Sequence, residues 1–319
     1  MIKIINLESV EYSPKHGTYK GKTSSKDGII YDNEMWILKY YPYAREYNEE
    51  HNKLEYSIPA LSEFITSHVF EMLGYPSQET MLAKRYDSLV VVCKDFTEGK
   101  DLIEIYNLWF IPREEIKPKY KTFKHGDTVY DDLINSYIFH LKHNPNFYNV
   151  EGMTERFWEQ SIVDVLINNS DRCDKNWGVL RDKNGNTTLA PMFDNGNGLE
   201  LPNTDDEVKE LLSNDELLYR TVLNTVSTYL AIRYKEHYIS NEDLRKAALK
   251  VVPLIESKLN DIFGFIDEIP EYQNFRDDTK LNICSSDRKE LYKKSLQIRF
   301  EVLLKPLYEA ALNYQVSRE

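Results

Sequence analysis

Two short polar segments decide the fold of this 319-residue chain: INNSDRCDKNWGVL at residues 167–180 and LAPMFDNGNG at residues 189–198. The first segment, called the first motif below, puts the carboxylate of Asp171 five residues before the amide of Asn176. The second motif puts another carboxylate, Asp194, after a strand-like run and before a glycine. A strand–turn–strand between the two motifs would bring both carboxylates to one cleft.

Phosphoryl transfer requires this set of side chains. One aspartate orients and deprotonates the attacking hydroxyl, while an asparagine and a second aspartate hold Mg²⁺ on the nucleotide phosphates. The metal matters because negative charge spreads over the phosphoryl oxygens, and a bound cation neutralises it. Aspartate and asparagine are also ordinary turn residues, so D-x4-N alone indicates little. The later Phe193-Asp194-Asn195-Gly196 favours a kinase, because protein kinases carry D-x4-N and then D-F-G in this order.

A lysine inside an apolar strand is a further candidate. Lys39 lies in MWILKYY at residues 35–41, and Glu63 lies in the helix-like segment that follows. In kinases a strand lysine contacts the α- and β-phosphates and pairs with a helix glutamate. We therefore expect Lys39 and Glu63 to form such a pair. The alternative for each is a solvated surface residue.

The segment before this strand, HGTYKGKTSSKDG at residues 16–28, combines glycines, hydroxyls and lysines. Backbone N–H groups and cations of such a loop can approach phosphates closely. The segment matches neither G-x-G-x-x-G nor the Walker sequence, so its position before Lys39 is the main support. The candidate nucleotide-binding residues in it are Gly21, Thr23, Ser24 and Ser25.

The arrangement of apolar residues predicts an α+β fold with two lobes. Before residue 97, alternating runs predict strands at residues 2–5, 28–31, 34–40, 78–84 and 89–93, and helical spacing predicts a helix over 59–73. After residue 97 we expect helices at 131–143 and 154–168, strands at 177–180 and 187–190, and helices from about 214 onward, the last one bent at Pro306. The expected domains are a β-rich lobe, residues 1–97, and a helical lobe, residues 98–319. In residues 41–58 and 109–128 the apolar residues show no regular spacing, which predicts long loops.

Composition limits the classes of function. A formal net charge of −12 argues against a general nucleic-acid binder, because phosphate backbones need a basic surface. The three cysteines are widely spaced and predict neither a disulfide framework nor a zinc site. Since no long apolar run or signal-peptide pattern is present, we expect a cytoplasmic protein without a membrane partner, with export by a route that needs no recognisable signal peptide as the alternative.

At these residues the chain resembles the HipA-type serine/threonine kinases of bacteria, in particular their short forms, which lack an extra N-terminal subdomain. The resemblance runs from about Pro14 to Gly198 and is clearest at residues 62–97, 168–180 and 190–196. It implies a bilobal protein-kinase-like fold, the use of ATP and Mg²⁺, and the phosphorylation of serine or threonine on a protein substrate.

The resemblance also assigns roles to single residues. It implies Asp171 as the catalytic base, Asn176 and Asp194 as Mg²⁺ ligands, and Lys39, the expected partner of Glu63, on the ATP phosphates. Adenine would lie against a hinge at residues 92–96, mostly through backbone groups. The further nucleotide contacts would come from Val92, Lys94, Phe96 and Lys175. Cys173 departs from the pattern, since the family usually has histidine there.

Regulation and partners follow from the same resemblance. In several relatives the kinase autophosphorylates a serine of the phosphate loop and ATP binding is lost, which makes Ser24 and Ser25 candidates here. A toxin-like kinase with an antitoxin partner is therefore expected. Two alternatives stay open: a lipid or small-molecule kinase, because D-R-x-x-x-N also resembles phosphoinositide kinases, and a non-catalytic kinase-like binding module. The absence of a basic membrane-facing run counts against a lipid substrate.

Overall fold

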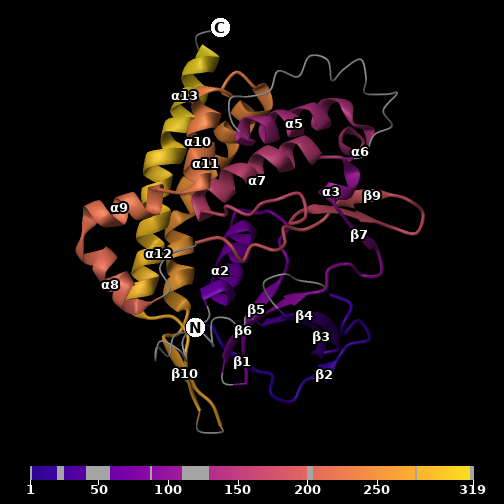
Figure 1. Cartoon of the computed structure of the whole chain (residues 1–319), viewed down its shortest axis with the longest axis vertical. Helices are drawn as coiled ribbons and strands as arrows, with labels where there is room; N and C mark the ends of the chain where they lie inside the picture. The colour runs from indigo at the N-terminus through magenta and orange to yellow at the C-terminus, as the bar shows by residue number, and fades with distance from the viewer. Residues whose placement is uncertain are drawn as a thin grey trace.

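A computed structural model of the chain describes residues 2–19, 25–40, 58–86, 88–109, 129–199, 204–276 and 279–316. Its N-terminal part is a six-stranded sheet in the order β1-β5-β6-β4-β3-β2 (Figure 1). The β1–β5 pair is parallel and the other pairs are antiparallel. The strands are β1 (Ile5–Asn6), β2 (Glu11–Tyr12), β3 (Ser25–Tyr31), β4 (Glu34–Tyr40), β5 (Thr80–Arg85) and β6 (Ser88–Lys94).

The β3–β4 hairpin turns at the predicted dipeptide. Asp32 and Asn33 have φ angles of 51° and 61°, the left-handed conformation that two-residue hairpin turns require. Tyr31 consequently pairs with Glu34, and this register continues along both strands. Since side chains alternate between the two faces of a strand, the turn also decides which residues of β4 face the interior.

The two faces of the sheet pack against different partners. One face carries Trp36, Leu38, Val90 and Val92 in a small apolar cluster. On the other face, Val91 and Cys93 join the main core together with helix α2 (Ile58–Met72). Helix α2 ends at Met72, shortly before the predicted cap residue Gly74, whose φ of 81° is the left-handed conformation of a C-terminal cap.

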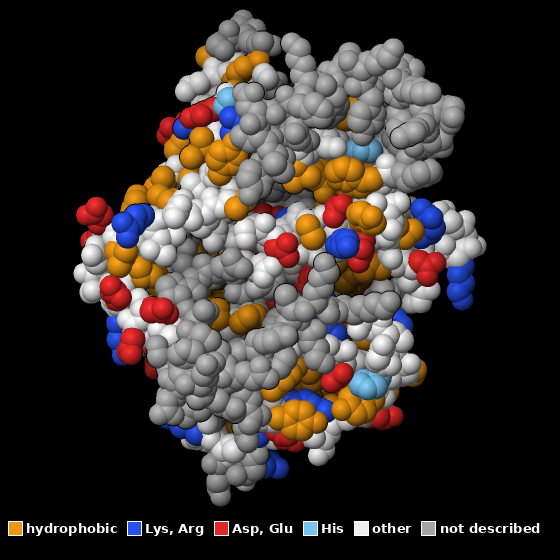
Figure 2. Space-filling model, viewed as in Figure 1, with side chains coloured by type: hydrophobic (Ala, Val, Ile, Leu, Met, Phe, Trp, Pro, Cys, Tyr) orange, Lys and Arg blue, Asp and Glu red, His pale blue; other side chains and the backbone are white. Residues whose placement is uncertain are grey.

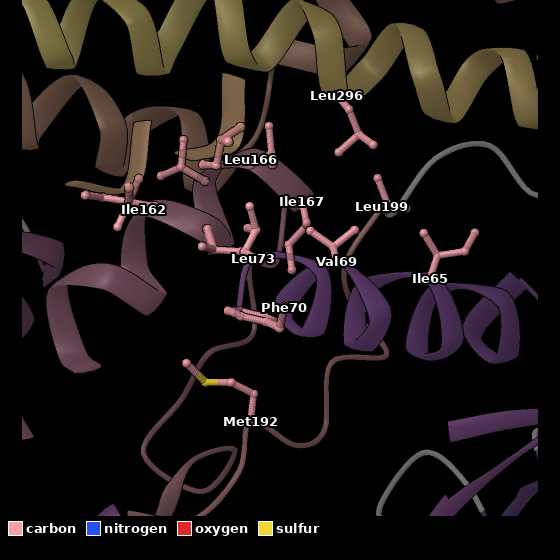
Figure 3. Close-up of a cluster of buried hydrophobic side chains, with 14 of the residues drawn as sticks. Ile65, Val69, Phe70, Leu73, Ile162, Leu166, Ile167, Met192, Leu199 and Leu296 are labelled. Atoms are coloured by element: carbon pink, nitrogen blue, oxygen red, sulfur yellow. The ribbon is translucent and has the colours of Figure 1, made fainter. Parts of the chain in front are cut away.

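Helix α2 connects the sheet to the helical part of the chain. Its residues Val69 and Leu73 point toward Ile167 and Leu166 of α7 (Met153–Ile167), while Phe70 faces Met192 (Figure 3). Helix α7 packs in turn against the long helix α11 (Glu242–Glu268) (Figure 1). One continuous core therefore includes residues from both parts of the chain.

The remaining elements are mainly helical. The helices are α3 (Ile105–Leu108), α5 (Val129–His143), α6 (Pro145–Tyr148), α7 (Met153–Ile167), α8 (Asp205–Ser213), α9 (Asp215–Leu223), α10 (Val226–Glu236), α11 (Glu242–Glu268), α12 (Ser286–Arg299) and α13 (Lys305–Val316). The strands β7 (Asp101–Glu104), β8 (Gly178–Arg181) and β9 (Thr187–Leu189) form a second sheet, and β10 (Tyr272–Asn274) pairs with β11 (Lys280–Asn282). No described helix is both long and apolar enough to cross a membrane.

The predicted bend near Pro306 takes the form of a π-helical turn. This turn, Phe300–Leu304, joins α12 to α13, and Lys305 N–H bonds to the carbonyl of Phe300. Proline cannot donate a backbone hydrogen bond, and its ring clashes with the carbonyl four residues before it. Widening the preceding turn accommodates this proline without ending the helix.

Several other sequence predictions need correction or remain open. Strands β7, β10 and β11 were not predicted, and the helices resume at Asp205 rather than at residue 214. The predicted loop residues 41–57 and 110–128 lie outside the described residues. The boundary between domains at residue 97 stays a prediction; the change from strands to mainly helices follows β6 and β7.

Candidate active site

Three charged side chains from distant parts of the chain meet at one point. Lys39 Nζ of β4 lies 2.8 Å from Glu63 Oε2 of α2 and 2.7 Å from Asp194 Oδ1 of the second motif. The Lys39 side chain is 4% exposed and that of Glu63 is fully buried, whereas that of Asp194 is 36% exposed. A buried ammonium requires such compensation by carboxylates. We call Lys39, Glu63 and Asp194 the charged triad.

The alternation of β4 explains how Lys39 reaches this point. Lys39 pairs with Val91 of β6, and Val91 belongs to the core beneath α2. Lys39 therefore extends from the face of the sheet that α2 covers, where Glu63 is buried.

Asp194 has an unusual backbone conformation and an acidic side chain. Its φ is 55°, a left-handed conformation that aspartate and asparagine adopt more readily than most residues. The charge of Lys39 holds the pKa of the Asp194 carboxyl down at about 2, and Lys26, whose Nζ lies 4.0 Å away, adds to this effect. Asp194 is therefore an anion at neutral pH.

Asp171 lies in a group of amides. Asn176 Nδ2 donates to the backbone carbonyl of Asp171 at 2.7 Å and to its Oδ2 at 3.2 Å, and Asn197 Nδ2 donates to the same Oδ2 at 2.8 Å. These bonds orient the Asp171 carboxylate. Because the amide nitrogen of Asn176 donates these bonds, its amide oxygen is the atom that can coordinate a cation.

Arg172 joins the two motifs, and sequence reasoning missed it. Its guanidinium donates two bonds to Asp164 of α7, at 2.9 and 3.0 Å. It also donates to the carbonyls of Asn176 and Phe193, at 2.8 and 2.9 Å, and to Asn195 Oδ1 at 2.5 Å. Arg172 therefore fixes the distance between the motifs. The only signal in the sequence was a charged residue directly after Asp171.

The second motif also binds to α2 through hydrogen bonds. The N–H of Asn195 donates to Glu63 Oε1 at 3.0 Å, and Thr66 Oγ1 donates to the Asn195 carbonyl at 3.0 Å. Ser62 Oγ donates to the carbonyl of Gly198 at 2.5 Å. A Cβ at Gly198 would lie 2.5 Å from the Thr66 methyl group, so only glycine allows this close approach.

The structure does not bring every predicted nucleotide-binding side chain to the charged triad. Val92 and Lys94 belong to the opposite face of β6 from Val91, and the Lys94 ammonium pairs with Glu34 at 2.7 Å and Glu79 at 3.4 Å. The backbone N–H and carbonyl of Lys94 are also bonded within the protein. The alternation of the strand thus turns both side chains away from α2, and their contact with the nucleotide stays a prediction.

The other predicted contacts have different outcomes. Phe96 packs against Phe193 with ring centroids 5.6 Å apart, next to the second motif. The Lys175 ammonium lies over the ring of Tyr106, 5.2 Å from its centroid. Gly21, Thr23 and Ser24 lie outside the described residues, and so does the side chain of Ser25, the first residue of β3.

Asp95 joins the start of the predicted phosphate loop to the predicted hinge. Lys15 Nζ and Tyr19 Oη each lie 2.6 Å from Asp95 Oδ2, and Thr97 also donates to this carboxylate. Burial alone would raise the pKa of Asp95, but the bonds from Lys15, Thr97 and Tyr19 outweigh it and hold the pKa at about 2. These bonds were not predicted from the sequence, because each joins two residues that are between 76 and 82 positions apart in the chain.

Comparisons with known proteins agree with this geometry. No family model matches the chain. The serine/threonine-protein kinase CtkA of Helicobacter pylori is 28% identical over 277 residues, which are 83% of this chain and 79% of the relative. The crystal structure of the H. pylori proinflammatory kinase CtkA is similar with a TM-score of 0.74 and 24% identity, over 97% of this chain and 99% of that chain. This likeness confirms the predicted α+β kinase-like fold.

A second similar structure is that of the Shewanella oneidensis toxin–antitoxin proteins HipA and HipB with operator DNA, with a TM-score of 0.46 and 13% identity over 94% of this chain and 68% of that chain. This similarity is too low to support an inference. Homology to CtkA over most of both chains, together with the order of the motifs, supports a place for the chain among the HipA-like serine/threonine-protein kinases.

Proposed function

We propose that the chain transfers the γ-phosphate of ATP to serine or threonine hydroxyls of a protein, with Mg²⁺ as the metal. The observation that carries this proposal is the charged triad, in which Lys39 contacts both Glu63 and Asp194, with Asp171 beside Asn176 in the neighbouring motif. The name of the relative CtkA supports serine and threonine as the acceptors.

In this proposal Lys39 contacts the ATP phosphates and Glu63 orients it. An ammonium with little solvent contact has few positions to adopt, so it is organised before the nucleotide arrives. Lys26 of β3, whose Nζ lies 4.0 Å from Asp194, adds a second positive charge at the end of the proposed phosphate loop. The loop of residues 16–28 would cover the phosphates, in a cleft between the proposed lobes.

The donor groups fit Mg²⁺. This ion prefers oxygen ligands and is usually held by one or two protein groups together with the phosphates of the substrate. Asp194 offers an ionised carboxylate and Asn176 offers its amide oxygen. Within the described ranges no group of three or more His, Cys, Asp or Glu side chains could hold a metal by itself, which accords with an ion shared with the nucleotide. When bound, the ion supplies positive charge to the transferred phosphoryl group.

Asp171 is the proposed base. It would accept the proton of the serine or threonine hydroxyl as the oxygen attacks the γ-phosphorus. The amides of Asn176 and Asn197 hold its carboxylate at Oδ2. This leaves Oδ1 to face the acceptor hydroxyl.

The decisive experiment compares phosphoryl transfer by wild-type protein, Asp171→Asn and Asp194→Asn, with labelled ATP and a generic protein substrate. Each substitution should abolish transfer, and the double variant should lose little more, because both residues serve one transition state. Asp206→Asn is the matched control, since its side chain on α8 is 88% exposed. Full activity in either single variant contradicts the assignment, and transfer only to lipid or to a small molecule selects the alternative kinase class.

The face of the molecule in Figure 2 gives no support to a general nucleic-acid partner. On the described part of the face in Figure 2, lysine and arginine side chains are scattered among carboxylates and form no basic patch. A toxin-like role with an antitoxin partner rests on the family resemblance alone. Co-purification of the chain with the product of an adjacent gene would test it.

We further propose that Ser24 or Ser25 is autophosphorylated and that this inactivates the kinase. A phosphate adds roughly −1.5 to −2 charges at neutral pH, which would repel the ATP phosphates and neutralise nearby lysines. Phosphosite mapping of active and Asp171→Asn protein, together with ATP-binding measurements, tests this. A phosphate missing from active protein, or one without effect on ATP binding, contradicts the regulatory proposal and leaves the kinase proposal intact.

A further inference from the structure

A cavity of about 170 Å³ lies between α5, α7 and α10, and one of its walls consists of Asn169, Ser170, Arg172 and Cys173. Loop residues on both sides of Asp171 line the cavity, whereas Asp171 itself does not. Most of the remaining wall is apolar and aromatic. Its buried members include Ile134, Tyr137, Phe157, Val165 and Trp177.

The cavity meets solvent beside the proposed base. Leu133 is 45% exposed, and Ser170 and Cys173, which also line the cavity, are exposed as well. Ser170 adjoins Asp171 in the chain, and Cys173 follows two residues later. Since consecutive Cα atoms are about 3.8 Å apart, both lie within about 8 Å of Asp171.

One buried polar group in the wall has no partner. Gln160 is 1% exposed, and its Oε1 makes no hydrogen bond to any of the described residues. Nearly all buried polar side-chain atoms in proteins are satisfied, so an exception calls for a ligand or water. The last torsion of a glutamine is soft, so this amide can turn toward an occupant of the cavity.

We propose that this cavity binds a tryptophan side chain of the protein substrate, close in sequence to the phosphorylated residue. The proposal rests on the proposed kinase function, which brings the acceptor hydroxyl to Asp171. An indole ring matches apolar walls, and its single N–H matches the unpaired acceptor of Gln160. An extended substrate advances about 3.3 Å per residue, so the tryptophan lies roughly two to four residues from the acceptor.

The first experiment tests the cavity without using kinase activity. The chain has three cysteines, and Cys93 and Cys284 are fully buried, so the iodoacetamide reaction of Cys173 at the entrance reports occupancy. The probes are indole and benzofuran, which has the same shape with oxygen in place of N–H. Indole should slow alkylation at least about fivefold and benzofuran much less, because only indole can donate to Gln160.

Two variants make this test specific. In Gln160→Met, which keeps the length of the side chain, protection by indole should fall to that by benzofuran. Gln297→Met is the matched control, because this glutamine is exposed on α12 and should change neither probe. Absence of protection by indole, equal protection by both probes in the wild type, or unchanged selectivity in Gln160→Met overturns the proposal.

The second experiment assigns the occupant. A set of peptides with one serine carries tryptophan or leucine at each position from five before to five after it. Tryptophan at one position within four residues should raise kcat/KM at least about tenfold over leucine, and Gln160→Met should abolish this preference. No positional preference alongside protection by indole means that the cavity takes a free small molecule, which overturns the substrate assignment.

The two experiments separate the failure of this inference from that of the kinase proposal. If no peptide or protein accepts phosphate, the kinase proposal and the substrate assignment fail together. The labelling of Cys173 still decides whether the cavity binds an indole ring. If transfer occurs but indole gives no protection, only the cavity proposal fails.

Discussion

Replacing Asp194 by asparagine isolates one charge of the triad. Asparagine adopts left-handed backbone conformations as readily as aspartate, so the φ of 55° should be retained. Lys39 keeps Glu63 as a partner at 2.8 Å. The main structural effect of Asp194→Asn is therefore the loss of the carboxylate charge beside Lys39.

The size of the effect follows from the pKa of this carboxyl. Its pKa is about 2 in the folded protein, against an ordinary value of 3.8. A difference of nearly two units corresponds to about 2.4 kcal/mol of folding free energy. Because the side chain is 36% exposed, solvent screens the interaction, and we expect about 1–2 kcal/mol.

The sign of the pH dependence follows as well. A carboxyl whose pKa is depressed by folding stabilises the protein above its unfolded pKa, and the contribution disappears as the pH falls through its folded pKa. The free energy of unfolding of wild-type protein should thus exceed that of Asp194→Asn at pH 7, and about half of this difference should be lost at pH 3.

Urea unfolding at pH 7 and pH 3 measures this difference, with Asp206→Asn as the control for an exposed carboxylate. Phosphoryl transfer, measured in parallel at pH 7, should fall at least about 100-fold in Asp194→Asn. A stability difference that is the same at both pH values would refute the electrostatic reasoning, and so would a variant as stable as the wild type at pH 7.

Three further outcomes can be checked. Arg172→Lys keeps the charge but not the planar donors, so urea unfolding should show a loss of about 3 kcal/mol, and phosphoryl transfer should fall with it. Gly198→Ala should lower the free energy of unfolding by about 1–3 kcal/mol, and Thr66→Ser, which removes the clashing methyl group, should restore part of this loss. By contrast, Gly264 has open space around it, so Gly264→Ala should stabilise α11 by roughly 0.5–1 kcal/mol. Asp95→Asn should speed hydrogen exchange of the amides at residues 15–19 relative to β5, because the bond from the Lys15 ammonium weakens; unchanged exchange would contradict that role.

The parts of the fold that depend on local patterns could be predicted. The turn at Asp32 and Asn33, the helix ending before Gly74 and the spacing of Asp171 and Asn176 all depend on neighbouring residues. The direction of the Lys94 side chain also follows from a local pattern, because the same alternation that directs Lys39 toward α2 directs Lys94 to the opposite face of the sheet.

The missed features depend on contacts between distant residues. Arg172 binds groups in α7 and in both motifs, and nothing near it in the chain distinguishes it from a surface arginine. Strand β10 has three residues, and its Gln273 exchanges hydrogen bonds with the backbone of Ile4, 269 positions away. Such short strands form because of tertiary contacts, which local propensity does not encode.

The sharing of one ammonium by two carboxylates has a consequence for ligand binding. If Lys39 binds the phosphates and Asp194 binds the metal, the 2.7 Å bond between Lys39 and Asp194 is replaced by two contacts, one to the nucleotide and one to the metal. A nucleotide without metal would leave the Asp194 carboxylate without a counterion, and a metal without nucleotide would be repelled by the Lys39 ammonium. ATP and Mg²⁺ should therefore bind cooperatively, and by thermodynamic reciprocity each should raise the affinity for the other by the same factor.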